Sequence, residues 1–257
     1  MLLTFLGTGD AAGVPVYGCT CPVCCRAKEE RRFRRLPCSA LLEIDGEQIL
    51  IDAGRMDIAD RFPVGSLSRI FLTHYHMDHV QGLFHLRWGC NTSIPVHGPG
   101  DVNGCGDLFK HPGILDFSQV MKPFEKQSFG EIHVTPVPLN HSKMTLGYCF
   151  SHQNSRLAYL CDTSTLPPAT LSFLQDWQPN HIVLDCTHPP QESPPRNHND
   201  YSMVLNLADK FKSSSFWLTH ISHNLDLWLS EHLNSLPDNV QIARDTMEIT
   251  IIKNSKN

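Results

Sequence analysis

The run Thr73-His74-Tyr75-His76-Met77-Asp78-His79 constrains this chain most, because it places four potential metal ligands within six positions. It follows the apolar segment 69–73, which is predicted to be a strand. Alternate side chains of an extended segment share a face, so His74 and His76 can reach one ion. Asp78 and His79 lie where the chain turns into a predicted helix, 79–86, and can reach a second. Imidazole and carboxylate suit zinc, manganese, iron or nickel. The run predicts a metal centre for two ions.

Three more candidate ligands, His141, Asp162 and His220, follow apolar segments elsewhere in the chain. Each segment is predicted to be a strand, so each ligand lies where a strand stops. Taken singly, such a residue has a structural explanation about as often as a functional one. As a set with His74, they predict that metal ligands gather on one rim of a sheet, where the Asp162 carboxylate could bridge two ions.

Ten cysteines are many for a cytoplasmic enzyme, and Cys19, Cys21, Cys24 and Cys25 lie within seven positions. In a reducing compartment such a cluster indicates a metal rather than disulfides. A structural zinc takes four nitrogen or sulfur ligands, and His223, three residues beyond His220, could be the fourth. Cys25 could replace Cys24 as the third thiolate, and a merely reactive cysteine loop is the alternative interpretation.

The composition is that of a globular protein, with 41% hydrophobic and 18% charged residues among 257. The formal net charge of -5 argues against a broad nucleic-acid-binding surface. No apolar run is long enough to cross a bilayer, and the first ten residues lack the basic region of a signal peptide. We therefore expect a cytoplasmic protein.

Strands and helices alternate along the chain, which predicts a single α/β domain over residues 1–257. A Gly- and Cys-rich loop and a basic stretch, 26–35, separate the first strand from the second. The turn Asp45-Gly46 joins the second and third strands. Asp200 is the expected N-cap of the helix at 200–211. The predicted strands are 2–6, 40–44, 48–52, 69–73, 94–97, 131–137, 146–150, 156–160, 181–185 and 215–219, and the other helices are 167–176 and 226–233.

The ligand pattern, together with Leu6-Gly7-Thr8-Gly9 and Asp52-Ala53-Gly54, resembles the metallo-β-lactamase superfamily over essentially the whole chain. This resemblance implies a four-layer αβ/βα sandwich with two metals at the sheet edges. It implies hydrolysis by a water activated between two ions about 3.5–4 Å apart. In that family pattern one ion is held by His74, His76 and His141, the other by Asp78, His79 and His220, and Asp162 bridges them.

Within the superfamily, the blocks HMDHVQGLF, DLFKHPGILDF, LNHSK, DCTHPP, PRNH and LTHISH closely resemble phosphodiesterases of the PhnP family. Those enzymes open 5-phosphoribosyl 1,2-cyclic phosphate to ribose 1,5-bisphosphate in the carbon–phosphorus lyase pathway of phosphonate catabolism. The resemblance implies manganese or nickel at the active site; we expect manganese there, with nickel or zinc as alternatives. It also implies a structural zinc on Cys19, Cys21, Cys24 and His223, and a homodimer. 2′,3′-Cyclic nucleotides are further expected substrates.

Two groups of residues are candidates for handling a small phosphorylated sugar. His198 is the candidate general acid, because imidazole titrates near neutral pH; a solvated loop histidine is the alternative. Arginine binds phosphate through paired hydrogen bonds, but a basic run is more often a solvated face. The phosphate-binding candidates are Arg31, Arg32, Arg34, Arg35, Lys110, His111 and Lys143.

Other functions of the same fold remain open. A tRNA 3′-processing nuclease is disfavoured by the acidic charge, so we expect neither a stable nucleic-acid partner nor a membrane partner. A di-iron redox protein would place Glu at position 76 and need a flavin domain. A β-lactamase would carry a signal peptide. A non-catalytic scaffold would have no need of seven intact ligands.

Overall fold

Apolar segments of the sequence pair into two seven-stranded mixed sheets in the computed structural model, which describes residues 1–232 and 236–251. The first sheet has the order β14-β1-β2-β3-β4-β5-β6 and the second β13-β12-β11-β10-β9-β8-β7. The first contains β1 (Leu2–Gly7), β2 (Ser39–Ile44), β3 (Glu47–Ile51), β4 (Leu67–Phe71), β5 (Ile94–Pro99), β6 (Leu115–Met121) and β14 (Glu248–Thr250). The second contains β7 (Gln127–Phe129), β8 (Ile132–Pro138), β9 (Leu146–His152), β10 (Ser155–Leu160), β11 (His181–Asp185), β12 (Ser215–Thr219) and β13 (Val240–Ile242).

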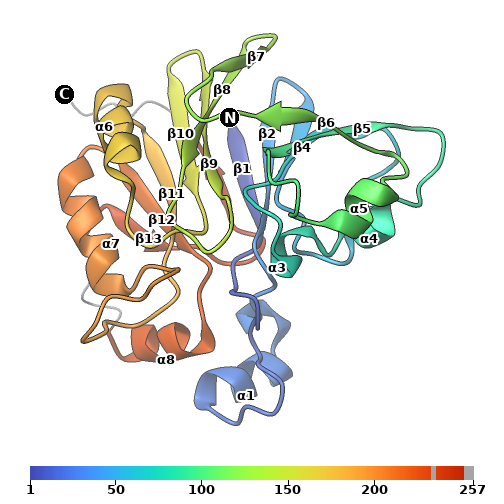
Figure 1. Cartoon of the computed structure of the whole chain (residues 1–257). Helices are drawn as coiled ribbons and strands as arrows, with labels where there is room; N and C mark the ends of the chain where they lie inside the picture. The colour runs from blue at the N-terminus through green and yellow to red at the C-terminus, as the bar shows by residue number, and fades with distance from the viewer. Residues whose placement is uncertain (233–235, 252–257) are drawn as a thin grey trace.

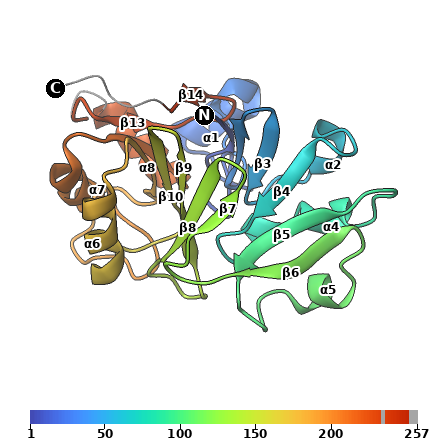
Figure 2. The same ribbon diagram turned by 90° about the horizontal axis from the view of Figure 1, so that it is seen from above.

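The two sheets pack face to face, and helices cover their outer faces (Figures 1 and 2). Aromatic side chains from both sheets, among them Phe5, Phe71 and Tyr148, fill the space between them. A second apolar cluster lies under α6, α7 and α8, and a third lies under α2, α4 and α5. This arrangement confirms the expected four-layer αβ/βα sandwich. The helices are α1 (Pro22–Glu29), α2 (Ile58–Arg61), α3 (Met77–Val80), α4 (Leu83–Leu86), α5 (Gly106–Lys110), α6 (Pro168–Trp177), α7 (Tyr201–Ala208) and α8 (His223–His232).

Every strand predicted from the sequence is present to within two residues, whereas several helices differ from expectation. The predicted helix 79–86 is two short helices, because Gly82 lies between them and packs against the backbone of residues 53–55. A Cβ at Gly82 would lie 2.0 Å from the carbonyl oxygen of Arg55. The helix predicted at 226–233 begins earlier, at His223, and residue 233 lies outside the described residues. Asp200 caps α7 as expected, since its carboxylate accepts from the backbone N–H of Met203.

Residues 15–36, the N-terminal arm, project from the sandwich and carry α1 (Figure 1). The sequence predicts an irregular loop and a basic stretch here, so the helix α1 was not predicted. Cys21 caps this helix, since its sulfur accepts from the backbone N–H of Cys24, and Pro22 fits the first turn. Val23, Cys24 and Ala27 form a small apolar cluster of their own.

In the second sheet β10, β11, β12 and β13 run parallel, and so do β3, β4, β5 and β6 in the first. The carboxyl ends of parallel strands meet at one edge of a sheet, which is where α/β folds place their sites. Asp162, His220 and His74 follow β10, β12 and β4 within three residues. No helix within the described ranges is both long and apolar enough to span a bilayer.

Candidate metal centre

The first group of ligand atoms converges from three segments that are distant in the sequence. His76 Nδ1 lies 2.9 Å from His74 Nε2 and 3.0 Å from His141 Nε2. Both Nε2 atoms lie 3.8 Å from Asp162 Oδ2. His74 and His76 belong to the loop after β4, whereas His141 follows β8 on the other sheet. The structure thus brings together the four residues expected around one ion.

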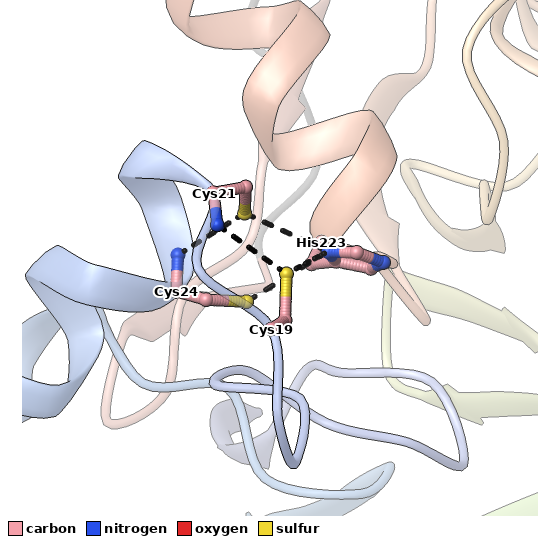
Figure 3. A group of neighbouring side chains, drawn as sticks. All are labelled: Cys19, Cys21, Cys24 and His223. Atoms are coloured by element: carbon pink, nitrogen blue, oxygen red, sulfur yellow. Dashed lines mark hydrogen bonds between the residues drawn. The ribbon is translucent and has the colours of Figure 1, made fainter.

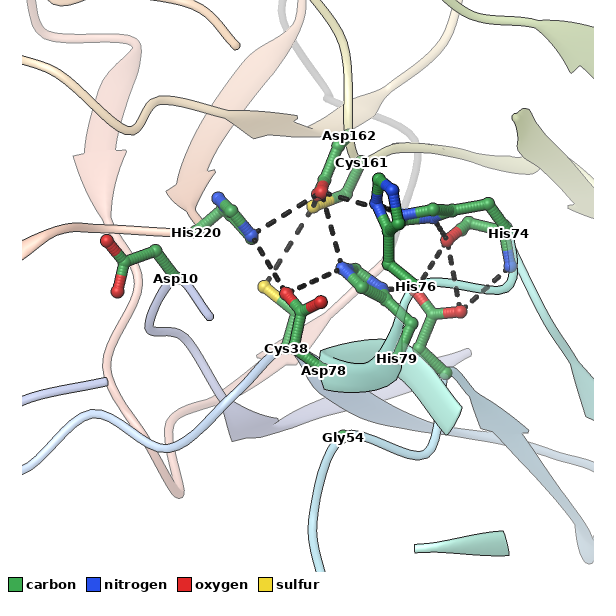
Figure 4. A network of polar contacts seen from close by, with 12 residues as sticks. Asp10, Cys38, Gly54, His74, His76, Asp78, His79, Cys161, Asp162 and His220 are labelled. Atoms are coloured by element: carbon green, nitrogen blue, oxygen red, sulfur yellow. Dashed lines mark hydrogen bonds and ion pairs between the residues drawn. The ribbon is translucent and has the colours of Figure 1, made fainter. Parts of the chain in front are cut away.

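The second group shares Asp162 with the first (Figure 4). His79 Nε2 lies 3.3 Å from Asp162 Oδ2 and 3.4 Å from Asp78 Oδ2. The corresponding distances from His220 Nε2 are 3.5 and 3.6 Å. Neither Nε2 atom has a hydrogen-bond partner, although both are buried. One oxygen of Asp162 therefore faces both groups, as expected of a bridging carboxylate.

In four of the histidines, the hydrogen-bond partner of Nδ1, the ring nitrogen that points away from Asp162, determines where the lone pair lies. His79 Nδ1 is 2.8 Å from Asp52 Oδ2, and His141 Nδ1 is 2.9 Å from the Asn197 carbonyl oxygen. These oxygens only accept, so Nδ1 carries the proton in both histidines. His74 Nδ1 and His220 Nδ1 contact the hydroxyls of Thr73 and Thr187, and each hydroxyl donates to an aspartate and so accepts from its histidine.

All four Nε2 atoms therefore present lone pairs to Asp162. A carboxylate binds a metal ion only when it is deprotonated, so Asp162 would be ionised in the metal-loaded centre. Two nitrogen or oxygen ligands at about 2.1 Å from a shared ion are separated by roughly 3.0–3.4 Å. The observed separations lie close to that range. Lone pairs and carboxylates without protons between them fit divalent cations better than a hydrogen-bonded network.

Two buried aspartates, Asp52 and Asp185, orient these ligands, and neither has a role predicted from the sequence. Asp52 follows β3 and accepts hydrogen bonds from His79, from the Thr73 hydroxyl and from the Thr73 backbone N–H. Asp185 ends β11 and accepts from the Thr187 hydroxyl. The signal that identifies Asp162, a carboxylate where an apolar strand stops, was present at both positions.

His198 lies beside the second group of ligands. Its Nδ1 is 2.8 Å from Asp185 Oδ2, and its ring stacks on that of His220 with centroids 4.7 Å apart. Burial would lower the pKa of His198, but the charge and hydrogen bond of Asp185 outweigh burial and raise it. Asp185 contacts Nδ1, so Nε2 lies on the other side of the ring from this carboxylate. The side chain is 21% exposed.

Cys19, Cys21, Cys24 and His223 form a separate cluster between the N-terminal arm and α8 (Figure 3). Their sulfur atoms lie 3.5, 3.7 and 3.7 Å from His223 Nδ1. A tetrahedral zinc with Zn–S of about 2.3 Å and Zn–N of about 2.0–2.1 Å separates these ligands by roughly 3.5 Å. Cys25 is outside the cluster, since its exposed thiol contacts the carbonyl oxygen of Thr20. The geometry favours Cys24 over Cys25 as the third thiolate.

Backbone hydrogen bonds connect this cluster to the ligand His220. The Ile221 N–H donates to the Thr8 carbonyl oxygen at 2.8 Å, and the Asp10 N–H donates to the Ile221 carbonyl oxygen at 3.4 Å. His220 and His223 are three residues apart, so the segment between the two groups of ligands is held by residues 8–10, which lie between β1 and the N-terminal arm.

The basic residues considered for phosphate binding have different surroundings. Arg35 is 2% exposed and makes a two-point ion pair with Asp226, so it is unavailable to a substrate. Arg32 pairs with Glu30 at the surface, and Arg34 donates to the Ala27 carbonyl oxygen. Lys143 reaches towards the Gly104 carbonyl oxygen at 3.5 Å. Arg31, Lys110 and His111 are exposed.

A family model for the beta-lactamase superfamily domain matches residues 47–221, which include all seven residues of the two ligand groups that share Asp162. The chain belongs to this family. A crystal structure of a diphosphatase from the PhnP family superposes with a TM-score of 0.80, is 27% identical in sequence, and covers 96% of each chain. The resemblance to the metallo-β-lactamase superfamily and to PhnP is thereby confirmed.

Curated relatives in this superfamily carry other names. An octanoyltransferase of Porphyromonas gingivalis is 28% identical over 266 residues, which are 98% of this chain and 52% of that protein. A ribonuclease Z of Methanothermobacter thermautotrophicus is 28% identical over 130 residues, which are 45% of this chain and 42% of that protein. The chain thus spans about half the length of these relatives.

Proposed function

We propose that this chain is a dinuclear metal-dependent phosphodiesterase that opens 5-phospho-α-D-ribosyl 1,2-cyclic phosphate to ribose 1,5-bisphosphate. The proposal is supported chiefly by the His198–Asp185 pair, whose distance is 2.8 Å, beside the ligand groups that share Asp162. Ligands alone fit many hydrolases of this superfamily. A histidine with one nitrogen held by a carboxylate and the other left for substrate adds the proton donor that a sugar leaving group requires.

The residues divide the reaction between them. Two divalent cations, held by the two ligand groups, would supply an activated water and neutralise charge on the phosphoryl oxygens. Asp52 and the threonines keep the histidine lone pairs directed at these cations. As one P–O bond of the cyclic diester breaks, His198 Nε2 gives a proton to the departing sugar oxygen. Asp185 stabilises the protonated ring and fixes its orientation.

The same proposal includes the remaining assignments. We expect manganese at the active site, with nickel or zinc as alternatives, and zinc at the Cys19 cluster, where three thiolates favour a soft metal. Participation in phosphonate catabolism and a homodimer follow from the resemblance to the PhnP family, and a cytoplasmic location is part of the same proposal.

A ribonuclease Z-type nuclease is the second candidate, because ribonuclease Z proteins are among the curated relatives. Hydrolysis of a diphosphate is a third, since the PhnP-family structure is described as a diphosphatase. Acyl transfer is not carried over, because about half of the octanoyltransferase has no counterpart in this chain.

A substrate panel separates these candidates. Manganese-loaded protein is assayed against 5-phosphoribosyl 1,2-cyclic phosphate, 2′,3′-cyclic nucleotides, a nucleoside diphosphate, pre-tRNA and a β-lactam, with chelated protein as control. We expect turnover of the cyclic phosphates, fastest for the ribosyl compound, and none after chelation. Cleavage of pre-tRNA or of the diphosphate without action on cyclic phosphates would overturn the proposal.

Replacement of the proposed acid tests the mechanism separately. His198→Ala should lower kcat on cyclic phosphates by about 10²–10⁴-fold, because the leaving oxygen loses its proton donor. Metal content, measured by elemental analysis, should not change. His133→Ala is the matched control, since His133 contacts Ser128 at the surface of the second sheet. Unchanged turnover in His198→Ala would remove this residue from the mechanism.

A further inference from the structure

Two buried thiols, those of Cys161 and Cys38, lie close to the shared carboxylate (Figure 4). Cys161 Sγ is 2.8 Å from Asp162 Oδ1 and 3.9 Å from Cys38 Sγ. Cys38 Sγ is 3.5 Å from the Thr219 hydroxyl oxygen. Both cysteines are completely buried. Neither belongs to a ligand group, and the proposed reaction uses neither.

The contact between Cys161 and Asp162 has a fixed direction. An ionised carboxylate oxygen can only accept a hydrogen bond, so the thiol donates. Asp162 thus uses its two oxygens differently: Oδ2 faces the imidazoles of His79 and His220 at 3.3 and 3.5 Å, and Oδ1 faces the thiol. Among the residues that the structure describes, no second donor to Oδ1 is found.

This hydrogen bond determines how the carboxylate is turned. The terminal torsion of an aspartate side chain has a broad minimum, so packing and hydrogen bonds set the plane of its oxygens. Rotation of Asp162 would move Oδ2 away from both ligand groups at once, since both share that atom. A single donor on Oδ1 can therefore act on two ion sites.

We propose that Cys161 is a positioning residue, whose thiol holds Asp162 in the orientation that lets one oxygen serve both metal ions. The inference rests on the metal-binding part of the proposed function and is independent of its substrate. Partners of metal ligands that are hydrogen-bonded in this way typically contribute about 10–100-fold to metal affinity.

The rival explanation is that Cys161 only fills space, as buried cysteines often do. The two explanations predict opposite orders for two substitutions. Cys161→Ser keeps a donor but places a hydroxyl in an apolar site, whereas Cys161→Ala removes the donor and leaves the site apolar. A positioning role requires the serine variant to bind metal better, and a filling role favours alanine.

The experiment titrates metal-free protein with Mn²⁺ and follows free Mn²⁺ by electron paramagnetic resonance. Cys161→Ala should weaken binding at the active site by about 10–100-fold, and Cys161→Ser should stay within about threefold of the unsubstituted protein. Cys161→Val, which fills the volume without a donor, should behave like alanine and replaces it if that variant does not fold. Cys38→Ala makes a cavity next to Cys161 but keeps the Cys161 thiol beside Asp162, so this variant should bind Mn²⁺ normally.

The results separate the two levels of the proposal. Serine equal to or weaker than alanine, or no change in any Cys161 variant, would overturn the positioning role while leaving the metal centre in place. Failure of the unsubstituted protein to bind Mn²⁺ or Co²⁺ would overturn the metal centre itself. Visible spectra of the Co²⁺-loaded proteins give a second readout, in which serine should retain the original bands and alanine should not.

Discussion

Four of the five histidines in the two ligand groups are directed by an acceptor on Nδ1, the ring nitrogen that points away from Asp162. Thr187 is such an acceptor. Its hydroxyl accepts a hydrogen bond from His220 Nδ1 at 2.8 Å and donates one to Asp185 at 2.8 Å. The aspartate fixes the direction of the hydroxyl, the hydroxyl fixes the tautomer of the imidazole, and the imidazole presents a lone pair to Asp162. The orientation of His220 therefore depends on two further residues, Thr187 and Asp185, that do not bind the ion themselves.

Removing that hydroxyl should weaken one ion more than the other. Thr187→Val has nearly the same shape but leaves the buried His220 N–H without an acceptor, so we expect the affinity for the second ion to fall about 10–100-fold. Titration with Mn²⁺ should then show one site close to its original affinity and one weakened. Thr170→Val is the control, since this buried residue of α6 donates its hydroxyl to the carbonyl oxygen of Pro138 in β8. Equal loss at both sites would contradict the assignment of His220 to one ion.

His97 provides a residue-level prediction away from the metals. It is 2% exposed, its two ring nitrogens have no hydrogen-bond partner, and its ring stacks on Phe71. Burial, and secondarily the charge of Arg69, lower its pKa from 6.5 to about 4, against a smaller opposing effect of Asp116. The folded protein therefore disfavours the protonated form that the unfolded chain adopts below about pH 6.5.

Stability should fall as the pH drops from about 6.5 to about 4, by up to roughly 3 kcal/mol from this residue alone. Above pH 6.5 its contribution is fully present. Urea unfolding of chelated protein at several pH values measures the effect without interference from metal binding. His97→Phe should remove this part of the pH dependence, and an identical pH profile for the two proteins would contradict the prediction.

Among the structural elements, the strands were predictable from the sequence and the short or interrupted elements were not. Buried strands such as β10 are continuous apolar runs, and the ligand at each end marks where the run stops. The strand β6 was missed because its open edge carries polar residues, and β7, β13 and β14 were missed because they have only three residues each. The break at Gly82 depends on a loop from another part of the chain, which no local pattern reveals.

In the candidate site, too, some residues were predictable from the sequence and others were not. The inner ligands and the Cys19 cluster were expected from residue type and spacing, and the structure brings them together. The roles of Asp52 and Asp185 could not be assigned, because their histidine partners lie 27 and 13 positions away along the chain. Arg35 was misleading for a related reason: a basic run suggests exposure, but one member of this run is buried against α8.

That buried ion pair joins two elements. Arg35 Nε and Nη2 each lie 2.9 Å from an oxygen of Asp226 in α8, and the arginine also donates to Thr8. Asp226→Ala should destabilise the fold by about 3–5 kcal/mol, because it leaves a buried guanidinium without its counterion. Urea unfolding measures this loss. Arg32→Ala, at the exposed pair with Glu30, should cost less than about 1 kcal/mol, and equal effects would contradict the account.

At the scale of the whole molecule, the two ligand groups form because two sheets meet at one edge. The first sheet supplies His74, His76, Asp78 and His79, and the second supplies His141, Asp162 and His220. Neither sheet has a complete ligand group, so metal binding and the docking of the two sheets should stabilise each other. The two ligand groups each link the two sheets, and the Cys19 cluster separately links the N-terminal arm to α8.

The central claim is that seven side chains hold two exchangeable ions through one shared carboxylate, beside a separate and tightly held zinc. Metal analysis after exhaustive dialysis, and again after reloading with manganese, tests it most directly. The account predicts one zinc per chain that survives dialysis, two manganese ions that reload, and loss of both manganese ions but not of zinc in Asp162→Ala. A single reloading ion per chain, or two that persist in Asp162→Ala, would contradict it.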